Sequence, residues 1–241
     1  MGSEKIGGVA ETMPQTLYAR AKESKKPHHK IYDEKAIEIV EQMDYDFSLA
    51  DKDTVMSSGV VSRTIVLDRM AADFVKEHPD ATVINIACGM DTRFYRVDNG
   101  KIRWYNIDLP VTMEVREKYI KENERVINIV ASAMDERWTA QIQTITDSVL
   151  IIVEGLSMYL TETDVKQILS IIDRHFPQVT VFMEILNPKF VKKNVEKSIQ
   201  QSGAVFTWGA RSGEELKRLC PTSARRSIGR ETEALWKGWW K

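Results

Sequence analysis

The sequence has little cysteine, no long apolar run and almost no net charge, and each shortage excludes a class of protein. Only Cys88 and Cys220 are cysteines among 241 residues, so we expect a reducing cytoplasm, no disulfide framework and no cysteine-rich metal site. The longest apolar stretch, Val149 to Val153, is too short to span a bilayer. A formal net charge of -1 provides no basic field for nucleic acid. We therefore expect neither a membrane nor a nucleic acid as partner.

What the chain does contain is an alternation of strand and helix patterns. Apolar residues make up 43% of the sequence, enough for one large folded core. Runs of branched apolar residues predict strands at 82–87, 102–107, 125–130, 148–153 and 179–185. Before the last strand, Thr161 and Asp164 predict a capping box for a helix that Pro177 ends. This order is typical of βαβ units and predicts an α/β fold with a parallel sheet.

Two amphipathic helices precede these strands. Apolar residues recur with helical spacing from Ala36 to Met43, behind a predicted N-cap at Asp33, and again from Val60 to Phe74. We expect residues 1–78 to form a helical cap or lid and residues 79–241 to form the domain that contains the sheet.

The first strand ends in a loop of small residues. Gly89 would let a ligand approach the backbone closely. Asp91 and Thr92 follow where a helix should begin, so its N–H groups and dipole would favour an anionic or carboxylate-bearing ligand. An ordinary strand-to-helix turn explains the same residues equally well, so the loop decides nothing alone.

Other strand ends carry groups that suit a nucleoside. Ligands of open α/β sheets lie beyond the carboxyl ends of the strands. Asp108 comes nineteen residues after Gly89, where a carboxylate can accept hydrogen bonds from ribose hydroxyls. Met134 and Asp135 suit an adenine, and Glu154 suits a ligand ammonium or sulfonium. The alternative is that these acids cap helices and loops.

Two nucleoside-binding classes compete for this pattern. An NAD-dependent oxidoreductase needs G-x-G-x-x-G, but residues 87–92 read ACGMDT with a single glycine. An enzyme that uses S-adenosyl-L-methionine needs only a close backbone approach, an acid for the ribose, an adenine site and groups for the amino-acid end. We therefore favour a methyltransferase, with a cofactor-binding module that lacks turnover as a further alternative.

The motifs resemble a known family. The segments NIACGMDTRFYRV, WYNIDLP, SAMDERW and VEGLSMYL occur in the order and spacing of the leucine carboxyl methyltransferase family. The N-terminal segments GVAETMPQTLYARAKES and YDEKAIEIVEQMDYDF are similar to its bacterial branch, which includes the tetracenomycin-type polyketide carboxyl O-methyltransferases. The resemblance implies a Rossmann-like class I methyltransferase sheet with helices on both faces. It also implies S-adenosyl-L-methionine as cofactor, bound by Arg63 at the methionine carboxylate, Gly89 at the cofactor backbone, Asp108 at the ribose, Met134 and Asp135 at the adenine, and Glu154 at the methionine end.

The expected acceptor is a carboxylate of a small molecule such as a polyketide-type metabolite. A carboxylate needs no general base, whereas a phenol or alcohol does, and none of the four histidines is placed at a predicted strand end. Tyr18, Arg20 and Tyr159 are the expected substrate contacts, with Arg20 holding the acceptor carboxylate.

The closing strand pair of class I methyltransferases is missing from the sequence pattern. No alternating segment follows RSGEELKRLCPTSARR, residues 211–226. The strand at 179–185 would then have an exposed edge that the tail at 224–241 or a second copy of the chain should cover. A homodimer is therefore an expected partner arrangement.

Overall fold

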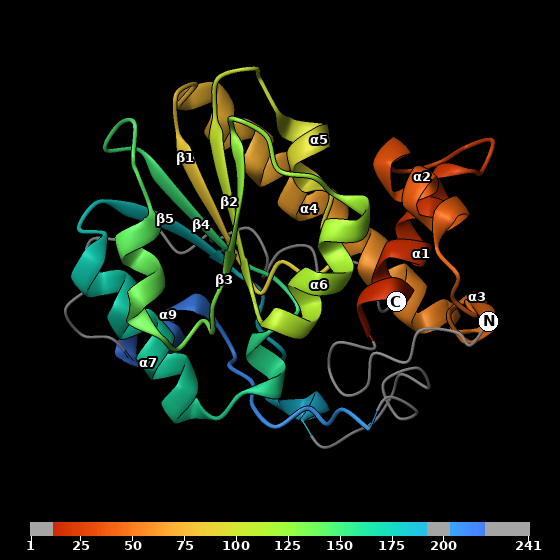
Figure 1. Cartoon of the computed structure of the whole chain (residues 1–241). Coiled ribbons are helices and arrows are strands. Elements are labelled where there is room, and N and C mark those ends of the chain that lie inside the picture. The colour runs from red at the N-terminus through yellow and green to blue at the C-terminus, as the bar shows by residue number, and fades with distance from the viewer. Residues whose placement is uncertain (1–11, 192–202, 220–241) are drawn as a thin grey trace.

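The centre of the molecule is a five-stranded parallel sheet with strand order β3-β2-β1-β4-β5 (Figure 1). The computed structural model describes residues 12–191 and 203–219. The strands are β1 (Thr82–Ile86), β2 (Arg103–Asp108), β3 (Val126–Val130), β4 (Val149–Val153) and β5 (Val179–Met183). All five confirm the predicted strands to within two residues, because continuous branched runs suit strands that are covered on both faces.

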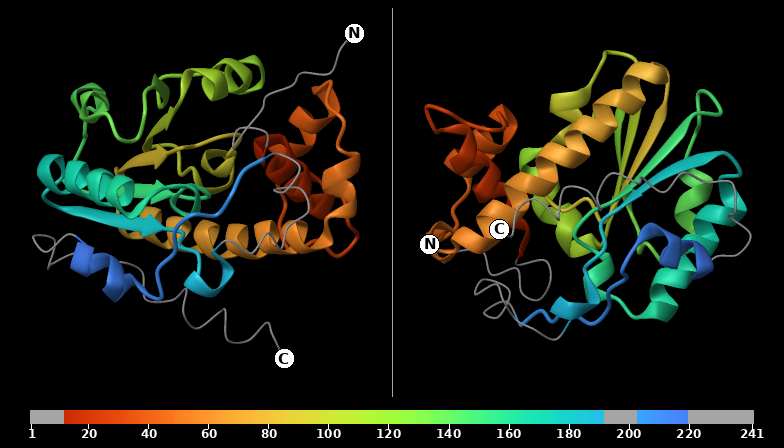
Figure 2. Two further views of the ribbon diagram at one scale, coloured as in Figure 1. Left: turned by 90° about the horizontal axis from the view of Figure 1, so that it is seen from below. Right: turned by 180° about the vertical axis from the view of Figure 1, so that it is seen from behind.

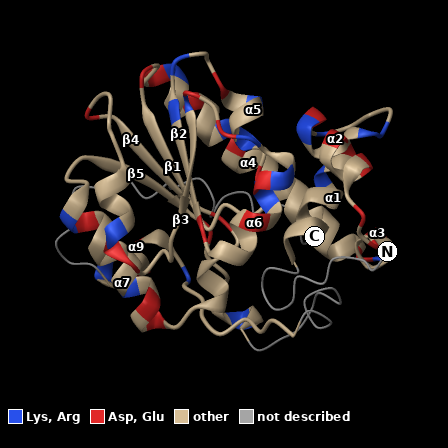
Figure 3. Cartoon of the chain, viewed as in Figure 1, with Lys and Arg blue, Asp and Glu red and all other residues tan. Residues whose placement is uncertain are grey.

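Charged residues are nearly absent from the strands and gather on helices and at strand ends (Figure 3). Along β4 the side chains alternate between two cores: Ile151 and Val153 enter one, and Leu150 and Ile152 enter the other. This alternation follows from the two-residue period of a strand, and it makes both faces of the sheet apolar. The helices are therefore needed on both sides.

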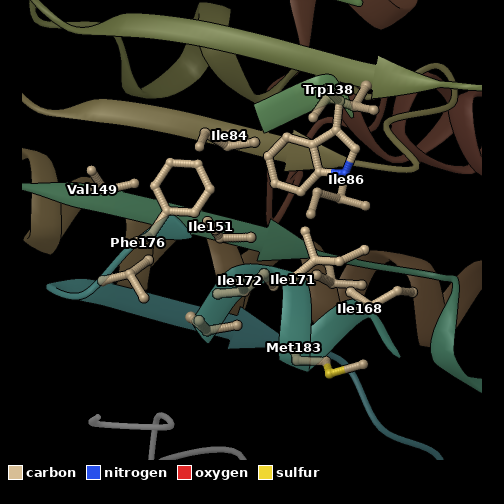
Figure 4. Packing of buried hydrophobic residues seen from close by; sticks show 14 of the residues in the cluster. Ile84, Ile86, Trp138, Val149, Ile151, Ile168, Ile171, Ile172, Phe176 and Met183 are labelled. Atoms are coloured by element: carbon tan, nitrogen blue, oxygen red, sulfur yellow. The ribbon is translucent and has the colours of Figure 1, made fainter. Parts of the chain in front are cut away.

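One face of the sheet is covered by α4 (Thr54–Glu77) and α5 (Arg93–Val97), as the rear view in Figure 2 shows. The other face is covered by α7 (Glu162–His175), the 3-10 helix η2 (Glu136–Gln141) and α9 (Gly213–Leu219). Figure 4 shows this second core, where Trp138 and Phe176 stack with ring centroids 5.8 Å apart. The Rossmann-like arrangement with helices on both faces is confirmed.

The N-terminal helices form a lobe beside the carboxyl ends of the strands (Figure 1). They are α1 (Thr12–Ser24), α2 (Glu34–Gln42) and α3 (Ser48–Lys52). Leu17 and Ile39 share a buried cluster with Met90 of the loop after β1 and with Ile120, which follows α6 (Pro110–Tyr119). The lobe therefore packs directly on the loop that the sequence marked as a ligand site.

Helix α4 takes part in both halves of the molecule. Met56 and Val60 pack against α1 and α3, while Leu67 and Val75 pack on the sheet. The division at residue 78 stays a prediction.

The sheet ends at β5 in the part of the chain that the structure describes, with no closing strand pair beyond it. Residues 203–210 instead lie against the segments that follow β4 and β5: the Thr207 N–H donates to the carbonyl of Met158 (2.7 Å) and the Ala210 N–H to that of Leu186 (3.0 Å). The expected covering tail at 224–241 lies outside the described residues. Within the described ranges, none of the helices combines the length and apolar character that a membrane crossing requires.

Candidate functional site

The strand order reverses between β1 and β4, and this topological switch point locates the candidate site. The chain runs outward from β1 through β2 to β3 and then returns to place β4 on the other side of β1. Loops on either side of such a point separate and leave space for a ligand at the carboxyl ends of the strands. Gly89 follows β1 and Glu154 follows β4, so both predicted residues flank the switch point.

The loop after β1 has the backbone of a close-approach site. Ala87 and Gly89 both have left-handed backbone angles, with φ of 54° and 48°. A Cβ on Gly89 would lie 3.3 Å from the Cγ of Met13, so α1 closes over this glycine. Arg116 of α6 fixes the loop by donating to the carbonyls of Gly89 (2.8 Å) and Asp91 (2.9 Å).

Gly89→Ala is expected to lower the free energy of unfolding by about 1 to 2 kcal/mol, because a Cβ is strained at positive φ and crowds Met13. Gly59→Ala is the matched control, since this glycine lies in α4 with nothing within 4 Å of an added Cβ. That control should stabilise the protein by about 0.5 to 1 kcal/mol. Urea unfolding measures both; equal effects would contradict the assigned strain.

Asp108 lies at the end of β2 and reaches back to the loop. Its Oδ2 accepts the N–H of Gly89 (2.8 Å) and its Oδ1 accepts the N–H of Leu109 (2.7 Å). Burial raises the pKa of Asp108, although these donors and the nearby Thr112 and Arg116 favour its ionised form. A carboxylate has about four acceptor positions, so both oxygens can also accept from ligand hydroxyls.

Glu154 lies beside two cations at the end of β4. Its Oε1 is 2.8 Å from the Nε of Arg63, and its Oε2 accepts from the Nη2 of Arg93 at 2.6 Å. Burial works against the ionisation of Glu154, but these two guanidinium groups outweigh burial and lower its pKa. Arg63 also contacts Glu184, which follows β5, with 3.3 Å between Nη1 and Oε1. Glu184 in turn accepts the N–H of Gly155 (2.7 Å).

The exposure of these side chains shows which part of the cluster can meet a ligand. Arg63 is 27% exposed, Glu184 23% and Glu154 14%, whereas Arg93 is 1% exposed. Arg63, Glu154 and Glu184 therefore form the accessible surface of the cluster, and Arg93 supports it from inside.

At the start of α5, a carboxylate of the protein takes the place of the anionic ligand that the sequence predicted. Asp91 supplies the anion itself: its Oδ1 accepts the N–H of Arg93 (2.9 Å), and its Oδ2 contacts the Nη1 of Arg93 at 2.8 Å. Thr92 is the N-cap residue, but its hydroxyl donates to Asp33 (2.6 Å) and makes no cap hydrogen bond. The first N–H of the helix and the Thr92 hydroxyl are thus satisfied from within the protein.

Met134 and Asp135 follow β3, next to the end of β2. Asp135 caps η2 by accepting the N–H of Arg137 (3.1 Å), and the side chain of Arg137 lowers the pKa of Asp135 to about 2. Met134 is partly buried against the core under α7. Both keep their place at the strand ends, and their contact with an adenine stays a prediction.

The three expected substrate contacts come from two parts of the chain, with Tyr18 and Arg20 on α1 and Tyr159 after β4. Tyr18 stacks on Phe47 and donates to Asp51 (2.8 Å) in the N-terminal lobe, whereas Tyr159 lies beyond β4. The two tyrosines stay predictions.

Arg20 is 4% exposed, and each of its nitrogens donates to the protein. Its acceptors are Asp33 (2.9 Å), the carbonyl of Thr16 (3.3 Å) and the carbonyl of Met90 (2.7 Å). These contacts tie α1 to α2 and to the ligand loop, so the guanidinium of Arg20 has a structural role and the prediction that it holds the acceptor carboxylate is wrong.

The sequence analysis gave no role to three charged residues of the ion-pair cluster around Glu154. They are Arg93, Glu184 and Asp68, the last of which pairs with Arg93. Glu184 could have been found, since it ends the fifth strand just as Glu154 ends the fourth. Arg93 lies in the family segment NIACGMDTRFYRV, which did not indicate what this arginine does. No pattern in the sequence of α4 marks Asp68 as part of a site. Cys88 is buried in the loop after β1, and burial raises the pKa of its thiol to about 12, so it is a structural residue of the loop and no nucleophile.

The family model described as leucine carboxyl methyltransferase matches residues 14–173. The chain belongs to the leucine carboxyl methyltransferase family. It is therefore a methyltransferase, and the alternative of an NAD-dependent oxidoreductase is excluded.

Two curated relatives cover most of this member of the family. The tetracenomycin polyketide synthesis O-methyltransferase TcmP of Streptomyces glaucescens is 32% identical over 90% of this chain and 81% of its own length. The S-adenosyl-L-methionine-dependent methyltransferase dpfgK of Gibberella zeae is 28% identical over 91% of this chain and 81% of its own. A crystal structure of a methyltransferase candidate from Thermobifida fusca YX has the same fold, with a TM-score of 0.56 and 13% identity over 88% of this chain and 79% of that one.

The described residues fit the S-adenosyl-L-methionine that the sequence predicted. The amino-acid end of this cofactor carries an ammonium and a carboxylate, and the accessible cluster offers Glu154 for the first and Arg63 for the second. Asp108 would meet the ribose, and the left-handed Gly89 leaves its backbone uncovered by a Cβ. The charges of the site thus complement the charges of the cofactor.

Proposed function

We propose that this S-adenosyl-L-methionine-dependent O-methyltransferase transfers a methyl group to a carboxylate of a small molecule of polyketide type. The mixed-charge cluster at the switch point, in a chain of this family, is the observation that carries the proposal. The similarity to TcmP, a polyketide synthesis O-methyltransferase, supports the acceptor class.

We assign the cofactor contacts to the residues predicted from the sequence. Arg63 would hold the methionine carboxylate, Glu154 the ammonium and Asp108 the ribose hydroxyls, with Gly89 close to the cofactor. When bound, S-adenosyl-L-methionine supplies a methyl group that its sulfonium already activates. The chain has to hold the acceptor in line with that methyl and keep water away.

The positions of the histidines favour a carboxylate over a phenol or an alcohol. His78 contacts Ser148, which precedes β4, and His175 ends α7 before β5. Both therefore lie at the amino-terminal edge of the sheet, opposite the site. His28 and His29 are exposed between α1 and α2. A carboxylate acceptor needs no base, so this arrangement suits ester formation.

The methylated product is therefore expected to be an ester. Aromatic polyketide-type acids would be incubated with the enzyme and methyl-labelled cofactor, and the product treated with alkali. Release of labelled methanol supports the proposal, because alkali cleaves esters and leaves ethers intact. An alkali-stable product would identify a hydroxyl acceptor. Binding of the cofactor without any turnover across the acids would favour the binding module.

We also propose that the enzyme works in a reducing cytoplasm, because the chain has only two cysteines.

We further propose that the outer edges of β5 from two copies of the chain pair in a homodimer. The edge consists of Val179–Met183, which pairs with no further strand among residues 12–191 and 203–219, and an unpaired apolar edge favours association. Light scattering over a concentration series, on the full chain and on a chain ending near Cys220, is expected to give a dimer mass for both. A monomer mass for the full chain would contradict the homodimer.

A further inference from the structure

Arg93 connects three carboxylates that come from three different elements. Its Nε donates to Asp68 of α4 (2.8 Å), its Nη1 to Asp91 after β1 (2.8 Å) and its Nη2 to Glu154 after β4 (2.6 Å). Its side chain is 1% exposed, so none of these contacts is made at the surface. The planar guanidinium can bond all three only in one orientation.

The position of Arg93 is fixed through Asp68, which a second arginine also contacts. Arg96 contacts Asp68 through both Nε (2.5 Å) and Nη2 (3.0 Å), and it also donates to Asp33 (2.6 Å). Asp68 is therefore held by two arginines, so it would stay in place if the side chain of Arg93 rotated. Arg93 is thus anchored to α4 on one side while it contacts Glu154 on the other.

Glu154 depends on two cations that differ in their accessibility. Arg63 is 27% exposed and lies where we place the cofactor carboxylate, so its charge is shared once the cofactor binds. Arg93 is buried and remains with Glu154 in either state. A carboxylate with little water around it stays ionised only while a cation or donor compensates it.

We propose that Arg93 is a positioning residue for the cofactor: it holds Glu154 ionised and oriented at the end of β4, so that this carboxylate meets the cofactor ammonium. The inference rests on the assignment of Glu154 to that ammonium under the proposed function. Arg93 itself touches neither cofactor nor acceptor. The charged groups in or next to the surroundings of Glu154 are Arg63 and Asp68 from α4, Arg93 from α5, Asp91 after β1 and Glu184 after β5.

The test is the affinity for S-adenosylhomocysteine, measured by calorimetric titration between about pH 5 and about pH 8. In the wild type the cations keep the pKa of Glu154 low, so an acid-side loss of affinity can come only from Asp108, whose pKa burial raises, and the wild-type profile is the reference. Arg93→Met should bind about tenfold more weakly at neutral pH. Its affinity should fall further as the pH drops, since Glu154 then protonates at a higher pH. An unchanged affinity at neutral pH together with the wild-type pH profile would overturn the proposal.

Arg96→Met is the matched control, because Arg96 belongs to the same ion-pair network and does not contact Glu154. It should lower stability while leaving the pH profile of binding as in the wild type; the same additional acid-side loss as in Arg93→Met would reduce Arg93 to a purely structural role. Circular dichroism checks that each variant is folded. If Arg93→Met does not fold, Arg93→Lys replaces it. A single ammonium cannot hold three carboxylates, so a smaller acid-side loss is expected, and a wild-type profile contradicts the proposal.

Glu154→Gln separates this inference from the assignment beneath it. If Glu154→Gln binds as tightly as the wild type, the placement of Glu154 at the cofactor is wrong. If Glu154→Gln weakens binding and Arg93→Met does not, only the role of Arg93 fails. Both are correct if Arg93→Met adds no pH-dependent loss in the Glu154→Gln background.

Discussion

Arg63→Met is expected to weaken binding of S-adenosylhomocysteine by roughly a hundredfold or more. Arg63 is proposed to meet the cofactor carboxylate, and two charge-assisted hydrogen bonds of about 1.5 to 3 kcal/mol each would be lost. The substitution also leaves Glu154 and Glu184 without the guanidinium that lies between them, so their negative charge would repel the same carboxylate. Calorimetric titration at neutral pH measures the loss.

Arg125→Met provides the matched control for Arg63. Arg125 is 33% exposed and also pairs with a carboxylate, Asp98, with 2.7 Å between Nη2 and Oδ2. It precedes β3, at the edge of the sheet away from the site. Its loss should leave cofactor affinity unchanged. Comparable losses in the two variants would mean that Arg63 acts only through general stability or charge.

Asp108→Ala should weaken cofactor binding by about tenfold or more, because the hydrogen bonds from the ribose hydroxyls lose their charged acceptor. The N–H groups of Gly89 and Leu109 also lose their acceptor, so the loop after β1 is less well fixed. Titration with S-adenosylhomocysteine is again the measurement. Methionine alone, which has no ribose, should bind to the wild type and to the variant with the same affinity.

Asp98→Ala is the corresponding control. Asp98 also accepts a backbone N–H, that of Gly100 (3.0 Å), and burial is likewise opposed by donors around it. It follows α5 at the opposite edge of the sheet. A tenfold loss of affinity in Asp98→Ala would show that removing any partly buried acid has this effect, and the ribose contact would no longer be supported.

The fold was predictable where local chemistry decides it. The predicted N-cap at Asp33 accepts the N–H of Ala36 (3.0 Å), and the capping box of Thr161 and Asp164 is present at the start of α7. Both need only residues that lie three positions apart. The parallel sheet likewise follows from apolar runs that are separated by helical patterns.

The ion-pair cluster was not predictable in the same way. Arg93 meets Asp68 and Glu154 from 25 and 61 residues away, and Arg63 meets Glu184 from 121 residues away. No local pattern encodes such pairs; they follow from the strand order, which brings the ends of β1, β4 and β5 together. Arg20 was misjudged for the same reason, since its partners Asp33 and Met90 are close only in the folded chain.

The central claim is that the switch point between β1 and β4 binds S-adenosyl-L-methionine through Asp108, Glu154 and Arg63. Calorimetric titration of the full chain with S-adenosylhomocysteine and, separately, with NAD tests it most directly. The account predicts one site per chain for S-adenosylhomocysteine, weakened in all three of Asp108→Ala, Glu154→Gln and Arg63→Met, and no heat of binding with NAD. Binding of NAD in its place, or wild-type affinity in the three variants, would contradict it.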